Sequence, residues 1–522
     1  MTTPNPVPAQ RCAPAAVALC QLTVLALVAS CSGGGDEPTP RRDVVLVTVD
    51  TLRQDYTSLG NSRYDTTPFL AELTARGTVF ENAFSMSSWT SPSMNMILTG
   101  EARIENDGAV LADQEHLAEV FQRNGYDTAG FIGNPILFEE NGFSRGCDVY
   151  EMVAVEKAHV VTAHDHVAKG LAWLDGLEAA RAQDAGAERD PFFLWIHPMD
   201  PHDPYEQHPD MGIALAEEPG ALDVARGTLS EKHAAMLTDA EWATLEELRT
   251  RYAGEVRQVD DALRVLWAGL EERGLADGVV FVLASDHGEG LWMRPPLKGE
   301  AQSRHPFPPL YMTHGIQLYS EQIHVPLVFV GPGVDAGRRE ARFVDTLDLA
   351  PTLLNLVGLR SQHVMDGTPL LGPGGAVPGG PVFALCNRVH SVTVDERWRL
   401  HVPSEYRAGK FGDVPLLYDL DADPDERSPV DDPERAATLA ALLEDWKEEH
   451  KRVNAYPEGS IAYYKALRAL GYGGETSNSK RMDQFLEDLE DEGLLPEDGS
   501  MPGAEEVRAL EERRGDEGGD GT

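Results

Sequence analysis

Apolar and polar positions along the chain follow two alternating patterns. Short β-branched apolar runs predict buried strands of a mostly parallel sheet, at residues 43–50, 127–133, 191–197, 278–287 and 325–331. Apolar residues at helical spacing predict helices, at residues 66–77, 113–126, 166–181 and 244–274. Strands that alternate with helices are typical of an α/β fold, in which helices cover both faces of one sheet.

The pattern changes beyond about Gly375. Short strand-like runs follow at residues 381–386, 390–395 and 398–403, and a helical pattern then occupies residues 433–452. We therefore expect an α/β domain over residues 43–375 and a small C-terminal domain over residues 376–472. Residues 473–522 are strongly acidic, which predicts a solvated and disordered tail.

The N-terminus has the pattern of an export signal. An apolar run at residues 15–30 is short and rich in small residues for a membrane-spanning helix. It ends in Val-Ala-Ser-Cys, which resembles a bacterial lipobox, in which Cys31 receives a diacylglycerol. We expect a lipoprotein signal over residues 1–30, a flexible tether over residues 31–42 and an exported protein anchored in the cell envelope, with Ser32 favouring the outer membrane. A plain signal peptide and an uncleaved anchor are the alternatives.

Composition limits the partners of the protein. The chain has 522 residues, of which 42% are apolar, enough for one large core and a smaller domain. Its formal net charge of −42 argues against nucleic acid or an anionic lipid surface as a partner, because phosphates would be repelled. Cleavage of the signal leaves Cys147 and Cys386 beyond the anchor, and they either pair in an oxidising compartment or stay free thiols.

Residues with metal-binding chemistry follow two of the predicted strands. Asp50 closes one strand, and Asp286 and His287 close another, so a parallel sheet would gather them at one edge. Hard divalent cations prefer oxygen ligands and accept an imidazole. Thr90 begins an apolar helix, whose free N–H groups favour an anion. Together they predict metal-assisted attack on a phosphate or sulfate ester. The simpler alternatives are helix caps for Asp50 and Thr90 and a turn for the other two.

Nine segments between residues 43 and 472 resemble those of the sulfatase branch of the alkaline-phosphatase-like hydrolases, in the order of that family. They include VDTLRQDYTSLG, PFFLWIHPMDPHDPY, SDHGEG, HGIQLYSEQIHVPLVFVGPG and DTLDLAPTLLNLVGL. The resemblance implies an α/β/α sandwich with a small C-terminal α+β domain, and one divalent metal ion at Asp50, Asp286 and His287. Calcium is favoured. Magnesium, manganese and zinc are alternatives because Thr51 stands where members often carry a second carboxylate.

The resemblance also marks departures from the family at the predicted catalytic centre. Thr90 occupies the position of the Cys or Ser that matures to formylglycine, and Met94 stands where the motif has arginine. Formylglycine chemistry is therefore not expected. In related branches a metal-bound threonine alkoxide is the nucleophile, which is the role predicted for Thr90. His202 and His314 are predicted to protonate a leaving oxygen or to hold a non-bridging one, with a buried, hydrogen-bonded histidine as the alternative.

Three further residues are predicted to bind substrate. Asn134 is the polar side chain of the GFIGN segment, where the family has a lysine and a histidine. Lys298 and Arg304 lie in a proline-rich loop over residues 291–313, which is long enough to suggest a functional loop. They can restore the positive charge that Met94 lacks, or they simply lie in water.

Three functions fit this set of residues. The first is an exported, metal-dependent hydrolase or transferase that acts on phosphoric or sulfuric esters through Thr90. The second is a sulfatase that works without formylglycine, and the third is a binding protein that has kept the fold without the activity. The substrate would be an anionic ester of a glycan, a lipid head group or a small molecule. The fold does not choose among these functions, so the site must.

Overall fold

The structure is a computed structural model. It describes residues 41–60, 65–103, 108–153, 161–182, 189–203, 205, 239–291, 314–315, 317–377, 379–386, 389–404 and 414–450. The chain divides into two units, Met1–Arg41 and Arg42–Thr522, and the elements described here belong to the second. The predicted signal over 1–30, nearly all of the tether over 31–42 and the tail over 473–522 lie outside the described residues.

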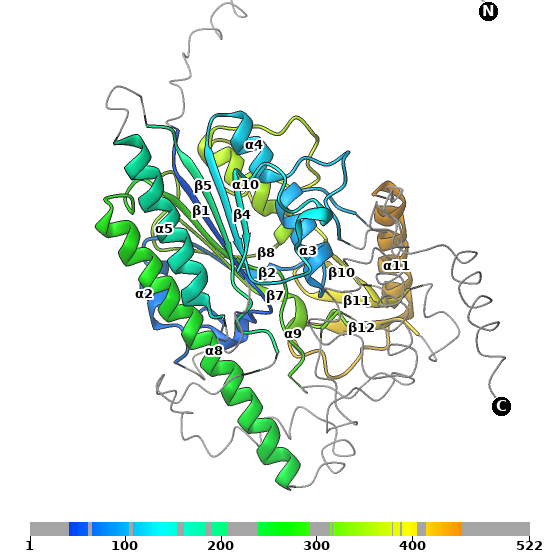
Figure 1. Cartoon of the computed structure of the whole chain (residues 1–522). Coiled ribbons are helices and arrows are strands. Elements are labelled where there is room, and N and C mark those ends of the chain that lie inside the picture. Colours follow the sequence, from blue (N-terminus) through cyan, green and yellow to red (C-terminus); the bar gives the residue numbers. More distant parts are fainter. Residues whose placement is uncertain are drawn as a thin grey trace, which may run out of the picture. The chain divides into compact units, whose positions relative to one another are not determined.

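An eight-stranded, mostly parallel sheet confirms the predicted α/β architecture (Figure 1). In chain order its strands are β1 (Val44–Val49), β2 (Gly77–Phe84), β3 (Asp127–Ile132), β4 (Val149–Met152), β5 (Phe192–His197), β6 (Val280–Ser285), β7 (His324–Val330) and β8 (Arg338–Asp345). They lie side by side in the order β4-β3-β5-β1-β6-β7-β2-β8. The first five strands of that order are parallel, whereas β7 runs antiparallel to both of its neighbours.

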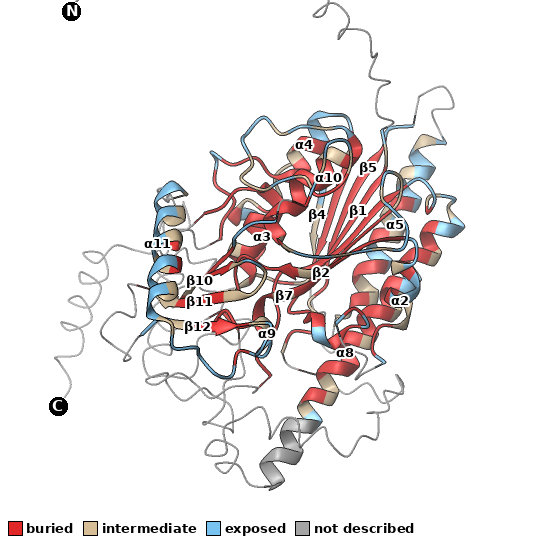
Figure 2. Cartoon of the chain, turned by 180° about the vertical axis from the view of Figure 1, so that it is seen from behind, coloured by how far each residue is buried: buried red, intermediate tan, exposed pale blue. Residues whose placement is uncertain are grey.

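Helices pack on both faces of this sheet (Figure 1). One face carries α2 (Pro68–Thr74), α5 (Ala163–Arg181) and α8 (Asp239–Glu272), and the other carries α3 (Thr90–Thr99), α4 (Leu117–Arg123) and α10 (Leu349–Val357). Within β1, Val45 and Val47 join the core under α2, α5 and α8, and Leu46 joins the core on the opposite face. Every residue of β1 is buried (Figure 2), which explains why the strand is a continuous apolar run.

A small antiparallel sheet follows, as the sequence predicts. Its strands are β9 (Val382–Leu385), β10 (Val389–Val394), β11 (Trp398–Pro403) and β12 (Leu416–Asp419), in the order β12-β11-β10-β9. The predicted helix at 433–452 is α11 (Pro433–Glu449), whose Leu439 and Leu443 pack against this sheet. Trp446 of α11 stacks on Phe383 of β9 with ring centroids 4.3 Å apart. The domain boundary at residue 375 stays a prediction.

The structure bears on the cysteines and on membrane-spanning helices. Cys147 and Cys386 are both free thiols, so the alternative of a disulfide between them does not apply to this structure. Among the described residues, each helix is either too short or too polar to cross a membrane. Short elements complete the described fold: η1 (Gln54–Tyr56), η2 (Glu139–Asn141), α9 (Ser320–Ile323) and η4 (Thr346–Asp348).

Candidate active site

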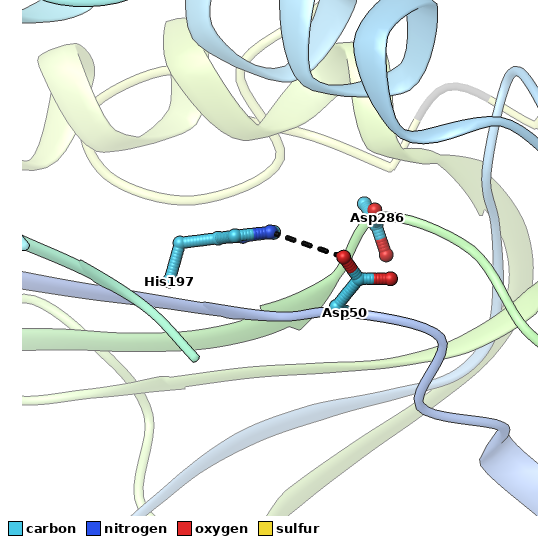
Figure 3. Close-up of side chains that lie close together, drawn as sticks. All are labelled: Asp50, His197 and Asp286. Atoms are coloured by element: carbon cyan, nitrogen blue, oxygen red, sulfur yellow. Dashed lines mark ion pairs between the residues drawn. The ribbon is translucent and has the colours of Figure 1, made fainter. Parts of the chain in front are cut away.

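Parallel pairing brings the ends of three strands together. Strand β1 lies between β5 and β6, and its last residue Val49 is opposite Ser285 of β6. Asp50 and Asp286, the next residues of β1 and β6, therefore meet at one edge of the sheet, beside His197 at the end of β5. Each of the three offers one ligand atom, and these atoms all lie within 4.8 Å of one another. Figure 3 shows the three side chains converging from neighbouring strands.

The three converging side chains fit a cation. All are fully buried. Asp50 Oδ1, Asp286 Oδ2 and His197 Nε2 have no hydrogen-bond partner in the part of the chain that the structure describes. Buried polar atoms are normally satisfied, and two enclosed carboxylates repel each other. A divalent cation would remove both penalties, because it binds carboxylate oxygen and imidazole nitrogen and neutralises their charge.

The electrostatics of the carboxylate pair agree with a cation site. Burial raises the pKa of Asp286 well above its usual value, and the charge of Asp50 raises it further. Burial acts in the same direction on Asp50, but the neighbouring imidazoles of His197, His202 and His287 outweigh it and hold the pKa of Asp50 below its usual value. Opposite shifts of this kind favour a single proton on the pair in the absence of a cation. A cation would displace that proton, so its binding should weaken at low pH.

The turn after β1 holds Asp286 in position. The backbone N–H groups of Thr51 and His287 donate to Asp286 Oδ1 at 3.1 and 2.7 Å, which leaves Oδ2 as the atom available to a ligand. Thr51 has a φ of 54°, in the left-handed region that β-branched residues rarely adopt. Such strain is typical of functional sites. At the position where members of the resembling family often carry a second carboxylate, this chain has Thr51, whose backbone N–H holds Asp286.

Thr90 is the first residue of α3, as the sequence predicts. The N-cap is Trp89, and Thr90 Oγ1 lies 3.1 Å from His287 Nε2. His287 Nδ1 donates to the Gly288 carbonyl at 2.9 Å, so Nε2 presents a lone pair. Burial, and then the charge of His314, lower the pKa of His287 to about 3, so this ring is neutral. A neutral Nε2 accepts the hydrogen of Thr90 or binds a metal ion.

Asn134 joins Thr90 to the carboxylates. Its Nδ2 donates to Asp50 Oδ2 at 2.5 Å and to Thr90 Oγ1 at 3.3 Å. Its Oδ1 accepts from the backbone N–H of Ile136 at 2.9 Å, which fixes the orientation of the amide because a backbone N–H needs an acceptor. The donor end of Asn134 therefore faces the site, where it can also donate to an oxygen of an anionic ester.

Three histidine rings lie close together beside Thr90. The ring centroid of His314 lies 4.5 Å from that of His287 and 5.1 Å from that of His202. His314 Nδ1 donates to Glu289 Oε2 at 3.1 Å, and His202 Nδ1 donates to the carbonyl of the next residue at 2.6 Å. Both of these hydrogen bonds are made through Nδ1.

The pair of His314 and Glu289 is a buried ion pair. Burial disfavours the charge on each side chain, but the carboxylate raises the pKa of His314 and the imidazolium lowers the pKa of Glu289. Each partner therefore keeps the other charged. Glu289 therefore favours the protonated form of His314 at this site.

The sequence missed two residues of this site. His197 is the last residue of a predicted strand. Its role follows from the pairing of that strand with the strand that closes on Asp50. Glu289 lies in the SDHGEG segment, two residues after His287. Its carboxylate accepts a hydrogen bond from His314. Both residues act through partners that lie far away in the sequence.

Three predicted residues fall in segments that the structure does not describe. Lys298 and Arg304 lie outside the described residues, and so does Cys31. Met94 is fully buried in the hydrophobic core under α3, α4 and α10. Position 94 therefore supplies packing, in agreement with the expectation that it supplies no charge.

Known proteins resemble this chain in sequence and in fold. Residues 42–359 match the family model for sulfatases. The multifunctional alkaline phosphatase superfamily protein PehA of Trinickia caryophylli is 26% identical over 210 residues, 36% of this chain and 38% of that protein. The Delta 4,5-hexuronate-2-O-sulfatase of Bacteroides thetaiotaomicron is 24% identical over 463 residues, 79% of this chain and 90% of that protein.

A solved structure has the same fold. The phosphonate monoester hydrolase of Agrobacterium radiobacter aligns with 78% of this chain and 96% of its own chain, with a TM-score of 0.54 at 19% identity. The match to PehA spans less than half of that protein, 38% of its length. These likenesses therefore establish the fold, while the chemistry depends on the residues at the end of the sheet.

Proposed function

The chain belongs to the sulfatase family, and we propose that it is a metal-dependent ester hydrolase with Thr90 as the nucleophile. The observation that carries this proposal is the position of Thr90 Oγ1. It lies at the N-terminus of α3, 3.1 Å from the lone pair of His287 and 3.3 Å from Asn134, beside the carboxylates of β1 and β6. A hydroxyl used only for packing or capping does not need this set of neighbours.

In the proposed reaction, Thr90 Oγ1 loses its proton to water and forms a bond to the phosphorus of the ester. The bond from phosphorus to the leaving oxygen breaks, and that oxygen takes a proton from His314 Nε2. A water molecule then attacks the phosphothreonine and gives one proton to His314. The bond from phosphorus to Thr90 Oγ1 breaks, and Thr90 takes back a proton from water. The free backbone N–H groups at the start of α3 hold the negative oxygens of the ester. A divalent cation at Asp50 and Asp286 would supply the positive charge that favours the ionised hydroxyl.

Phosphoric and phosphonic esters are the favoured substrates. A phosphothreonine is resolved by water, whereas a sulfated threonine lacks the second hydroxyl that lets a formylglycine diol expel sulfate. The similarity to a phosphonate monoester hydrolase supports this choice, and the similarity to a sulfatase makes sulfuric esters the alternative. The ester can belong to a glycan, a lipid head group or a small molecule.

One divalent metal ion is the proposed cofactor. The sequence favoured calcium, with magnesium, manganese and zinc as alternatives, on the basis of two carboxylates and one imidazole. His197 adds a second imidazole to that count.

The proposed enzyme works outside the cytoplasm, in the cell envelope. This rests on the signal pattern over residues 1–30 and on the Val-Ala-Ser-Cys sequence that ends at Cys31. A lipid at Cys31 and a flexible tether over residues 31–42 would hold the catalytic domain near a membrane. Nucleic acid is not an expected partner, because the net charge of −42 repels phosphate backbones.

A substrate screen tests the proposal. The purified chain would be offered aryl phosphate monoesters, phosphate diesters, phosphonate monoesters and sulfates, each with calcium, magnesium, manganese and zinc. We expect metal-dependent cleavage of phosphorus esters at higher kcat/KM than of matching sulfates. Faster cleavage of sulfates would favour a sulfatase that works without formylglycine. If no ester is cleaved with any metal, the chain is a binding protein that has kept the fold.

A further inference from the structure

His197 has a free ring nitrogen at the carboxylate pair. The side chain is fully buried at the end of β5, and its Nε2 has no hydrogen-bond partner within the described ranges of the chain. Nε2 lies 3.6 Å from Asp50 Oδ2, which is longer than a hydrogen bond. Figure 3 shows the ring pointing at the two carboxylates. A buried nitrogen in this position needs a partner of another kind.

Two neighbours hold the ring of His197 through its Nδ1. Thr48 Oγ1 lies 2.9 Å from His197 Nδ1, and it accepts a hydrogen bond from Trp195 Nε1 at 2.8 Å. A hydroxyl oxygen has two acceptor positions, so Thr48 can accept from the indole and from Nδ1 together. With a cation bound, the hydrogen of His197 lies on Nδ1 and the lone pair of Nε2 points toward Asp50 and the ion. A lone pair that faces a carboxylate is repelled unless a positive ion lies between them.

The spacing between these atoms is that of two ligands of one ion. Donors that each lie about 2.1 Å from a tetrahedral metal ion are about 3.4 Å apart. His197 Nε2 and Asp50 Oδ2 are 3.6 Å apart, and His287 Nε2 and Asp286 Oδ2 are 3.4 Å apart. Both rings are held through Nδ1, which is how metal-binding histidines are usually oriented.

We infer that His197 is a metal ligand and that the site selects a nitrogen-binding transition metal ion, such as Zn²⁺ or Mn²⁺, over Ca²⁺. This inference rests on the proposed metal at Asp50 and Asp286. Calcium takes six to eight oxygen ligands, whereas imidazole suits zinc and the other first-row transition metals. The family resemblance points to one imidazole ligand, and the chain offers two.

Metal binding without substrate tests the inference. The purified chain would be freed of metal with a chelator and titrated separately with Zn²⁺, Mn²⁺ and Ca²⁺ in a calorimeter. We expect Zn²⁺ to bind at least about 100-fold more tightly than Ca²⁺. His197→Ala should reduce the affinity for Zn²⁺ by at least about 10–100-fold and leave the weak binding of Ca²⁺ nearly unchanged. Preference for Ca²⁺, or equal Zn²⁺ affinity in the variant, overturns the inference.

Control variants separate loss of a ligand from loss of a buried ring. His166 is also fully buried and also has an Nε2 without a hydrogen-bond partner among the described residues, but it lies outside the group of ligand atoms. His166→Ala should keep the affinity for Zn²⁺, and an equal loss in both variants contradicts a ligand role. If His197→Ala does not fold, Thr48→Val keeps the shape of the strand residue and removes the hydroxyl that orients His197. It should weaken Zn²⁺ binding by about 10–100-fold, and unchanged affinity overturns the inference.

A spectroscopic measurement counts the nitrogen ligands directly. Pulsed electron paramagnetic resonance of the Mn²⁺-loaded wild-type chain should show ¹⁴N coupling, and His197→Ala should lose part of it. Identical coupling in the two proteins rules His197 out. Because neither experiment uses an ester, a failed substrate screen with Zn²⁺ binding through His197 would disprove the proposed reaction and leave this inference standing.

Discussion

His314 Nδ1 donates to Glu289 Oε2 at 3.1 Å, and both side chains are almost completely enclosed. The two residues are 25 positions apart in the sequence. Glu289 fixes the tautomer of His314 and raises its pKa against the effect of burial. In the proposed reaction this carboxylate keeps His314 protonated and turns its Nε2 toward the leaving oxygen.

Replacement of Glu289 by Gln tests that role. We expect kcat to fall by about 10–100-fold, with a smaller change in KM. The carboxylate raises the pKa of His314, so its removal should move the high-pH limb of the kcat profile to lower pH. The measurement is kcat against pH for a phosphorus ester. Glu272→Gln, at the exposed end of α8, is the matched control and should behave as wild type. An unchanged profile in Glu289→Gln would show that Glu289 is only structural.

Thr90→Ala should abolish the reaction and preserve the fold. Removal of a nucleophile typically costs several powers of ten in rate, on the order of 10⁴ to 10⁶. Stability should change by about 1 kcal/mol or less, because Trp89 and not Thr90 is the N-cap of α3. Single-turnover mass spectrometry should detect phosphothreonine at position 90 in wild type and not in the variant.

Two further variants serve as comparisons for Thr90→Ala. Thr90→Ser keeps the hydroxyl and should keep part of the activity. Thr438→Ala, on the exposed face of α11, removes a threonine hydroxyl far from the site and should be fully active. Near-full activity of Thr90→Ala would disprove the mechanism.

Asp286→Asn should stabilise the protein without metal and remove most of the stabilisation by metal. Burial and the charge of Asp50 raise the pKa of Asp286, so its contribution to stability is present at low pH and is lost as pH rises. Asparagine carries no charge, so the variant does not lose this stability as the pH rises. Its amide oxygen still accepts hydrogen bonds from the backbone N–H groups of Thr51 and His287. Melting temperatures should be compared at pH 5 and pH 8, with and without Zn²⁺. Asp277→Asn, at an exposed position, is the control. Equal metal-induced shifts in wild type and Asp286→Asn would contradict the assignment.

The elements and part of the site were predictable from local sequence. Strands such as β1 and β6 are buried on both faces and therefore appear as apolar runs, and the parallel topology places Asp50 beside Asp286. The hydroxyl-rich turn and apolar helix likewise placed Thr90 at the start of α3. These features depend on a few neighbouring residues, so composition and periodicity are enough to find them.

The remaining features depend on pairing between distant segments. His197 gains its role because β5 is the neighbour of β1, and a sequence pattern does not give the order of strands. The reversed direction of β7 is not visible in its apolar run either. Glu289 contacts His314 across 25 positions of sequence. In each case the missing information is a contact between residues far apart in the chain.

Cys31→Ala should abolish lipid attachment. The Val-Ala-Ser-Cys sequence after the apolar run predicts that Cys31 receives the diacylglycerol, and alanine has no thiol to accept it. The variant should lose labelling with a radioactive or clickable fatty acid and either become soluble or keep its signal. Cys20→Ala, inside the apolar run, is the control and should label normally. Labelling and membrane association that persist in Cys31→Ala would refute the lipoprotein prediction.

Asp345 and Asp348 predict a second pH effect, far from the site chemistry. Burial raises the pKa of Asp345 to about 7, and burial together with the charge of Asp345 raises the pKa of Asp348 well above its usual value. Asp345 Oδ1 has no hydrogen-bond partner among the described residues, while Asp348 Oδ1 accepts from the backbone N–H of Thr368 at 2.6 Å. A shared proton would relieve the repulsion between the two carboxylates.

The sign of this effect follows from the raised pKa values. Because the folded protein holds the proton more tightly than the unfolded chain, the stability from this pair is complete below about pH 4 and is lost as the pH rises through about 7. Asp345→Asn keeps an acceptor for the backbone N–H groups of Leu347 and Asp348 and removes one charge. It should raise the melting temperature at pH 8 by a few degrees, about 2–4 °C for each kcal/mol gained, and change it little at pH 5. Asp431→Asn, an exposed carboxylate before α11, should leave the pH dependence unchanged. A variant with the same pH dependence as wild type would show that the two carboxylates do not share a proton.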